Sequence, residues 1–204
     1  LVKASKKLEN AKLIVIGDSI VDHYVACEAL GMSAEAPVIV VKEIEAKNFV
    51  GGAAIVASHI ASLRSKCEFI SVVGEDYQGK WIHNELENNS VKVKLFVDKN
   101  RPTTFKKRYL VENQKLFRVS RLDDHLINKQ ITKNILDHIE KISHSVNGII
   151  ISDFVYGLIT EELITGIVNC AKKNNIKLFG DLQCSSQIGD ISRMQDFTML
   201  CPNE

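Results

Sequence analysis

Apolar positions along the chain follow two alternating patterns. Short continuous apolar runs have the length and composition of buried strands, and they lie at residues 12–16, 67–73, 148–151, 177–179 and 197–201. Longer segments with apolar residues every three or four positions are typical of amphipathic helices, and they lie at residues 53–63, 77–88, 128–144 and 160–174. Strands that alternate with helices predict right-handed crossovers and an α/β fold, with one parallel sheet flanked by helices.

Four of the apolar runs end on small polar clusters. These clusters are Gly17-Asp18-Ser19, Ser152-Asp153, Gly180-Asp181 and Pro202-Asn203. The carboxyl ends of parallel strands lie along one edge of a sheet, and ligands of open α/β sheets bind at that edge. The pattern therefore predicts that the functional site lies there.

One stretch departs from the strand and helix alternation. Residues 103–111 and 115–121 are two β-prone runs around Glu112-Asn113-Gln114, which predicts an antiparallel hairpin. Together with the extended region 25–44, this hairpin could form a small separate sheet beside the main one. We interpret it as a β-sheet lid, with segments at about 24–47 and 101–121, that closes over a small ligand and excludes water.

Composition and charge narrow the possible partners. A chain of 204 residues can bury one substantial core, so we expect one domain with an elaboration. The formal net charge of +1 gives no electrostatic reason to expect nucleic acid or a membrane surface as partner. No apolar run reaches the ~18 residues of a membrane span. The five cysteines show no CxxC spacing, which is typical of reduced thiols, so we expect a cytoplasmic protein. The six histidines show no metal-binding spacing, and no metal ligands are predicted.

Two motifs near the first strand could bind a ligand. Gly51 and Gly52 precede a helix, where glycine lets the backbone approach a ligand and the first helical amides are free donors. A tight entry turn explains the pair equally well. Asp18 and Asp22 follow the first strand, where a carboxylate can accept hydrogen bonds from the hydroxyls of a sugar, although Asp18 could also serve as a turn or cap residue.

Positive charge is concentrated on the predicted lid. The basic residues are Arg101, Lys106, Lys107, Arg108 and Arg118. In a nearly neutral chain this local excess could bind an anionic group such as a phosphate. The alternative is a solvated strand face, because alternate residues of a strand point outward.

Together these motifs resemble the ribokinase (PfkB) family of carbohydrate kinases. The resemblance runs from about Lys12 to Glu204, and within the family the likeness is greatest to the heptose 7-phosphate kinase domain of ADP-heptose synthesis. It rests on Gly17-Asp18-Ser19-Ile20-Val21-Asp22, Ala34-Glu35-Ala36-Pro37-Val38, Gly51-Gly52-Ala53-Ala54, Arg101-Pro102-Thr103-Thr104-Phe105-Lys106-Lys107-Arg108, Leu116-Phe117-Arg118-Val119, Ser152-Asp153 and Cys201-Pro202-Asn203.

The resemblance implies a ribokinase-like fold and ATP-dependent phosphoryl transfer to a hydroxyl of a sugar or sugar phosphate. Magnesium would bridge the phosphate oxygens. The substrate-binding residues it implies are Asp18, Asp22, Gly51, Gly52, Lys106, Arg108 and Asp153, with the two cations near the sugar's phosphate. Asp181 and Asn203 would lie in the nucleotide and magnesium region. A homodimer that pairs its lids is also implied.

The resemblance further implies that residues 12–204 are the N-terminal part of a sugar-kinase domain, preceded by a linker or extension at residues 1–11. In this family a Gly-Ala-Gly-Asp loop near the C-terminus supplies the catalytic base, so we expect that base beyond Glu204. An alternative stays open, in which the chain is a non-catalytic relative that binds a sugar phosphate or acts as a scaffold. It is suggested by Ile55, Tyr156 and Gln183, which stand where the family usually has polar or cationic residues.

Overall fold

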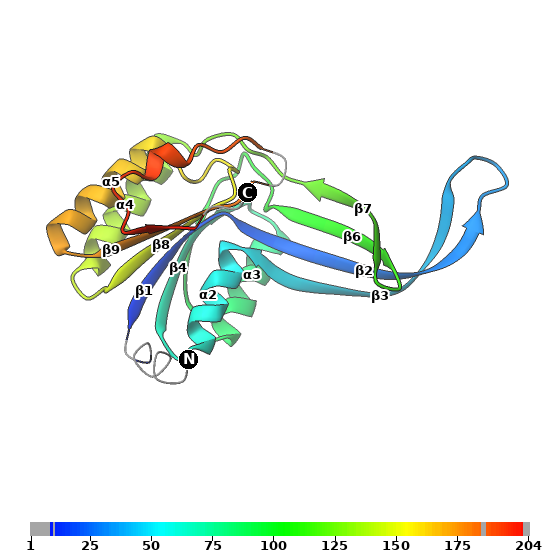
Figure 1. Cartoon of the computed structure of the whole chain (residues 1–204), viewed down its shortest axis with the longest axis horizontal. Helices are drawn as coiled ribbons and strands as arrows, with labels where there is room; N and C mark the ends of the chain where they lie inside the picture. Colours follow the sequence, from blue (N-terminus) through cyan, green and yellow to red (C-terminus); the bar gives the residue numbers. More distant parts are fainter. Residues whose placement is uncertain (1–8, 10, 185–186, 202–204) are drawn as a thin grey trace.

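The computed structural model describes residues 9, 11–184 and 187–201, which form two sheets (Figure 1). The main sheet has six parallel strands in the order β10-β9-β8-β1-β4-β5. These strands are β1 (Lys12–Gly17), β4 (Lys66–Val73), β5 (Lys92–Val97), β8 (Gly148–Asp153), β9 (Lys177–Leu182) and β10 (Met199–Leu200). The predicted parallel sheet is therefore confirmed.

Strand β5 was not predicted. It lies at one edge of the main sheet beside β4, and its alternating sequence is Lys-Val-Lys-Leu-Phe-Val. The sequence signal was this alternation of apolar and polar residues, which is typical of a half-buried strand.

Helices cover both faces of the main sheet (Figure 1). Helices α2 (Ala53–Ser62) and α3 (Tyr77–Asn88) pack on one face, around Val15 and Phe69. Helices α4 (Lys129–Ser143) and α5 (Glu161–Asn174) pack on the other, around Ile14 and Ile151. These four helices lie where the apolar spacing predicts them. A short 3₁₀ helix, η1 (Ile191–Met194), follows β9.

The second sheet has four strands in the order β3-β2-β6-β7 and extends from the main sheet as an arm (Figure 1). Its strands are β2 (Ser19–Met32), β3 (Ile39–Gly52), β6 (Phe105–Val111) and β7 (Gln114–Arg121). The small separate sheet and the β6–β7 hairpin are confirmed. The sheet is longer than expected because only Asp18 separates β1 from β2, so the chain runs directly from one sheet into the other.

The cysteines are free thiols, as the spacing predicts. Cys27, Cys67 and Cys170 are buried, and burial raises the pKa of the Cys67 thiol to about 12. These three side chains therefore serve in packing. Among the described residues, no helix is both long enough and apolar enough to cross a membrane.

Candidate functional site

Carboxylates gather at the carboxyl edge of the main sheet. Gly17 of β1 pairs with Ser152 of β8, and Ser152 pairs with Asp181 of β9, so the ends of three neighbouring strands lie side by side. This register brings together Asp18, Asp153 and Asp181, as the strand pattern predicts. Asn203, the fourth predicted member, lies outside the described residues.

Asp18 is buried and holds the loop that follows β8. Its Oδ2 accepts hydrogen bonds from the backbone amides of Phe154, at 3.0 Å, and Tyr156, at 3.3 Å. Burial, and to a lesser extent the charge of Asp153, raise the pKa of Asp18 to about 7. These contacts fit the turn role that the sequence left open beside sugar binding, and they give the edge a carboxyl group that titrates near neutral pH.

Asp153 directs a carboxylate oxygen into the same region. Its Oδ1 accepts a hydrogen bond from the amide of Val155 at 2.8 Å, whereas its buried Oδ2 has no hydrogen-bond partner among the described residues. Burial raises the pKa of Asp153, and Arg193, whose Nη1 is 3.8 Å from Oδ2, opposes that shift. Sequence reasoning missed Arg193, because nothing in the local pattern shows that η1 lies beside the end of β8.

Asp181 is tied to its neighbours. Its Oδ2 accepts a hydrogen bond from the Ser152 hydroxyl at 3.3 Å, and its Oδ1 accepts one from the Gln183 amide at 2.7 Å. In the part of the chain that the structure describes, no three His, Cys, Asp or Glu side chains form a group that could hold a metal ion.

The loop after β8 has a strained backbone. Val155 has a φ of 60°, which is unusual for a β-branched residue. Gly157 has a φ of 86°, and a Cβ there would overlap the carbonyl oxygen of His125. Such conformations persist where the surrounding contacts hold them, and they are frequent at functional sites.

A cavity of about 550 Å³, which we call the junction cavity, lies where the second sheet joins the main sheet. Its lining residues are Asp22, Tyr24, Phe49, Val50, Gly51, Gly52 and Ile55. The rings of Tyr24 and Phe49 meet edge to face, with centroids 5.7 Å apart. The structure thus brings Asp22 and the glycine pair together, and it adds two aromatic residues that sequence reasoning missed because they only appear as ordinary strand residues.

Both glycines lie close to neighbouring groups, and Gly52 is required by its backbone surroundings. A Cβ on Gly51 would overlap Oδ2 of Asp22, so glycine makes room for that carboxylate beside the cavity. Gly52 has a φ of 61°, and a Cβ there would overlap the carbonyl oxygen of Asp18. That same oxygen accepts a hydrogen bond from the amide of Ala53 at 2.9 Å. The pair therefore makes a tight entry turn into α2 and also lines the cavity.

The cations of β6 lie in register with the cavity residues of β2. Asp22 pairs with Lys106 and Tyr24 with Arg108, so these four side chains share one face of the second sheet. Arg108 forms an ion pair with Asp22, and its guanidinium lies 5.3 Å from the centroid of the Tyr24 ring. Asp22, which is predicted to bind the sugar, and Arg108, which is predicted to bind its phosphate, therefore contact each other.

Lys106 is more enclosed than the sequence suggests. It is only 3% exposed, and its Nζ lies 5.0 Å from the centroid of the Tyr156 ring. Its neighbour Lys107 points to the opposite face of β6, because adjacent strand residues alternate. Arg118 of β7 pairs with Arg108, so it shares the Lys106 face and is exposed.

The placement of Arg101 on the lid is wrong. Arg101 precedes β6 and is buried at the junction, where its Nε donates to Asp98 at 3.0 Å. Its Nη1 donates to the carbonyl oxygen of Tyr156 at 2.9 Å, and its Nη2 to that of His125 at 2.6 Å. Charge clustering along the sequence could not reveal these partners, because they come from other loops.

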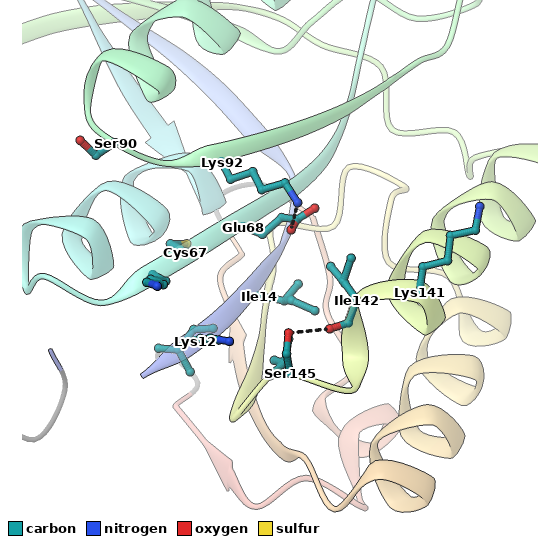
Figure 2. A pocket seen from close by; sticks show the side chains of 12 residues that line it. Lys12, Ile14, Cys67, Glu68, Ser90, Lys92, Lys141, Ile142 and Ser145 are labelled. Atoms are coloured by element: carbon teal, nitrogen blue, oxygen red, sulfur yellow. Dashed lines mark hydrogen bonds and ion pairs between the residues drawn. The ribbon is translucent and has the colours of Figure 1, made fainter. Parts of the chain in front are cut away.

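A second cavity, of about 490 Å³, lies at the opposite edge of the main sheet (Figure 2). It is lined by the amino ends of β1, β4 and β5 and by the end of α4. Figure 2 shows Lys92 paired with Glu68, at 2.8 Å, and the aliphatic side chains of Ile14 and Ile142. Since ligands of open α/β sheets bind at the carboxyl edge, we do not assign the function to this cavity.

The sequence is similar to those of proteins named bifunctional protein HldE. It is 37% identical over 199 residues to the bifunctional protein HldE of Helicobacter hepaticus, which covers 96% of this chain and 40% of that protein. It is 32% identical over 198 residues to the bifunctional protein HldE of Campylobacter jejuni, with the same coverage of 96% and 40%. The chain thus spans about two fifths of the length of these relatives.

Solved structures share the fold. Arabidopsis thaliana ribokinase, determined with ribose and ATP, superposes with a TM-score of 0.67 at 19% identity over 96% of this chain and 61% of its own. Giardia lamblia ribokinase gives a TM-score of 0.68 at 14% identity over 95% and 62%. The predicted ribokinase-like fold is therefore confirmed. Residues 10–204 match the family described as pfkB family carbohydrate kinase. The chain belongs to the pfkB family of carbohydrate kinases.

Proposed function

We propose that the protein containing this chain transfers a phosphoryl group from ATP to a hydroxyl of a sugar that already carries a phosphate, with heptose 7-phosphate as the expected substrate. One observation carries the proposal. Asp22 lines the junction cavity, and two cations, Lys106 and Arg108, lie beside it on the same face of the second sheet. A carboxylate suits sugar hydroxyls, and arginine and lysine suit a phosphate.

The chain's own residues bind and orient the substrate in this proposal. Asp22 accepts hydrogen bonds from sugar hydroxyls, and Gly51 gives its carboxylate the room to face the cavity. Tyr24 and Phe49 supply apolar walls for the sugar ring. The second sheet acts as the lid, covering the bound sugar and excluding water.

In this proposal the reaction also uses a catalytic base outside the described part of the chain. A new bond forms between the sugar oxygen and the γ-phosphorus, while the bond to the β-phosphate oxygen breaks and ADP leaves. The hydroxyl proton passes to a base that we expect beyond Glu204. In this proposal Asp153 lines the cleft and Asp181 belongs to the nucleotide region, as does Asn203, which lies outside the described residues. Family membership and the fold shared with an ATP-bound ribokinase support ATP as the donor. No step depends on the described residues holding magnesium.

The proposal also includes a homodimer, which the second sheet supports, and a cytoplasmic location, which rests on the sequence alone. Strands β3 and β7 are the edges of the second sheet, and edge strands carry unpaired backbone groups that suit pairing with another chain. Exposed apolar side chains lie on the β2–β3 arm: Leu30, Met32, Val38, Ile39 and Ile44. Such a concentration of apolar surface favours contact with a second copy.

Turnover tests the proposal directly. ADP release from the full-length protein is measured with ATP and either heptose 7-phosphate, unphosphorylated heptose or common hexoses. We expect turnover with heptose 7-phosphate and much lower kcat/KM with every unphosphorylated sugar. Preference for an unphosphorylated sugar would contradict the phosphate assignment, and sugar-phosphate binding without any ADP release would favour the non-catalytic alternative.

A further inference from the structure

Tyr156 lies where three parts of the candidate site meet. Its amide donates to Asp18 at the end of β1, at 3.3 Å, and its carbonyl oxygen accepts from Arg101, at 2.9 Å. Its ring lies under the ammonium of Lys106 from the second sheet. One residue of the main domain therefore contacts the carboxyl edge, the connection to β6 and the cationic face of β6.

The backbone of Tyr156 is fixed from both sides. It stands between Val155 and Gly157, which both have positive φ, and a Cβ on Gly157 would overlap the backbone of the segment before α4. Arg101 connects this loop to the same segment, because it also donates to the carbonyl oxygen of His125. Asp98 neutralises the buried guanidinium of Arg101. The main domain thus determines where the Tyr156 ring lies.

The ring in turn sets the position of a buried cation. Lys106 is 3% exposed and Tyr156 is 2% exposed, so water has little access to either. A lysine ammonium is costly to bury unless it is stabilised, and the face of an aromatic ring stabilises a cation most strongly where water is excluded. Lys106 lies beside Asp22 in the register of β2 and β6, so the contact with the Tyr156 ring lies next to a residue that lines the junction cavity.

We propose that Tyr156 is a positioning residue for substrate binding, whose ring holds the Lys106 ammonium at the junction of the two sheets, where it serves the anionic group of the sugar. This inference rests on the proposed function. It assigns the preference for a phosphorylated sugar jointly to Lys106 of the second sheet and to Tyr156, which follows a strand of the main sheet. Arg101 contributes by holding the Tyr156 carbonyl.

Two variants of the full-length protein separate the ring from the hydroxyl. Tyr156→Leu removes the ring, and we expect the KM for heptose 7-phosphate to rise about tenfold. We expect the Ki of unphosphorylated heptose, measured as a competitive inhibitor, to change less than about twofold, because that sugar has no phosphate for Lys106. Tyr156→Phe keeps the ring and should retain the wild-type constants. Near-UV circular dichroism and thermal unfolding establish that both variants fold.

A matched control comes from the same strand. Lys107 lies over the ring of Tyr109, with Nζ 4.9 Å from the centroid, on the opposite face of β6. Tyr109→Leu therefore removes a similar contact away from the junction cavity. It should leave unchanged the ratio of the KM for heptose 7-phosphate to the Ki of unphosphorylated heptose. An equal rise of both constants in Tyr156→Leu, or the same loss in Tyr156→Phe, would overturn the positioning role.

A measurement without turnover distinguishes this inference from the proposed function. In protein labelled with ¹³Cε-lysine, and with the Lys106 signal assigned through Lys106→Met, the aromatic ring should shift the ε-methylene signal upfield. We expect this shift in wild type and Tyr156→Phe but not in Tyr156→Leu. If wild type shows the shift but phosphorylates no sugar, the proposed function fails while the contact stands. An unshifted signal in wild type refutes the contact itself, whatever the activity.

Discussion

At the scale of single residues, Asp22 shows how the site depends on close fit. Its carboxylate lies against Gly51, pairs with Arg108 and lines the junction cavity. The side chains of Asp22 and Arg108 are only 20% and 17% exposed, so the ion pair is partly shielded from water. The ion pair orients a carboxylate oxygen of Asp22 toward the cavity. It also makes the position of the Arg108 guanidinium dependent on Asp22.

Asp22→Asn tests that dependence. The amide keeps the size of the side chain but loses the charge, so we expect the affinity for the sugar phosphate to fall about tenfold to a hundredfold. Isothermal titration calorimetry on the full-length protein measures this loss. Glu45→Gln, an exposed residue of β3, is the control and should bind like wild type. Unchanged affinity in Asp22→Asn would place the sugar elsewhere.

Asp18 predicts how stability changes with pH. Its folded-state pKa of about 7 lies above the ordinary value of 3.8, so the folded protein holds a proton that the unfolded chain releases. The resulting stabilisation is complete below about pH 4 and is lost as the pH rises through 7. The raised pKa of Asp153 acts in the same direction.

Asp18→Asn should therefore flatten this dependence. The variant gains stability relative to wild type as the pH rises from 5 to 8, by on the order of 2 kcal/mol. Urea unfolding at a series of pH values measures the difference. Asp196→Asn, whose side chain is 59% exposed, provides the comparison and should follow the wild-type curve. A constant difference between Asp18→Asn and wild type at all pH values would show that Asp18 is ionised throughout.

At the scale of elements, strand β6 places two adjacent lysines on opposite faces of the second sheet, and we assign them different roles. Lys106 faces the side that carries Asp22 and Arg108, whereas Lys107 faces the other side with Tyr109. The sequence places them together in one basic run, and only the alternation of the strand distinguishes them.

We expect Lys106→Met to raise the KM for heptose 7-phosphate about tenfold to a hundredfold, because a charged hydrogen bond to phosphate is lost while the aliphatic stem is kept. Lys107→Met is the matched control on the same strand and should change the KM less than about twofold. Steady-state kinetics of the full-length protein compare the two variants. Equal effects would mean that the basic run acts only through its summed charge.

At the scale of the whole molecule, the second sheet forms an arm with exposed apolar residues, which supports the proposed homodimer. Ile44 on β3 and Leu126 before α4 are both 67% exposed, but only Ile44 belongs to this arm. Ile44→Lys should shift the full-length protein from dimer toward monomer in light scattering after gel filtration, since it places a charge in an apolar contact. Leu126→Lys should leave the dimer intact. A wild-type monomer at micromolar concentration would contradict the proposal.

Much of the architecture could be predicted from local pattern. Residues 128–144 carry isoleucines at helical spacing, and α4 buries Ile131, Ile135 and Ile139 as expected. The polar residues that follow β1, β8 and β9 meet because parallel strands place their carboxyl ends at one edge. Strand β5 was missed because its alternation is short and its lysines resemble those of a loop.

The sequence by itself determined the elements other than β5, the two sheets and the gathering of Asp18, Asp153 and Asp181 at one edge, because hydrophobic periodicity and strand direction are local properties of the chain. Only the tertiary structure decided that Asp22 pairs with Arg108, that Arg101 is buried at the junction and that the ring of Tyr156 lies under Lys106. These contacts join residues between 50 and 86 positions apart along the chain. Their partners are selected by packing between the two sheets, which no local pattern encodes.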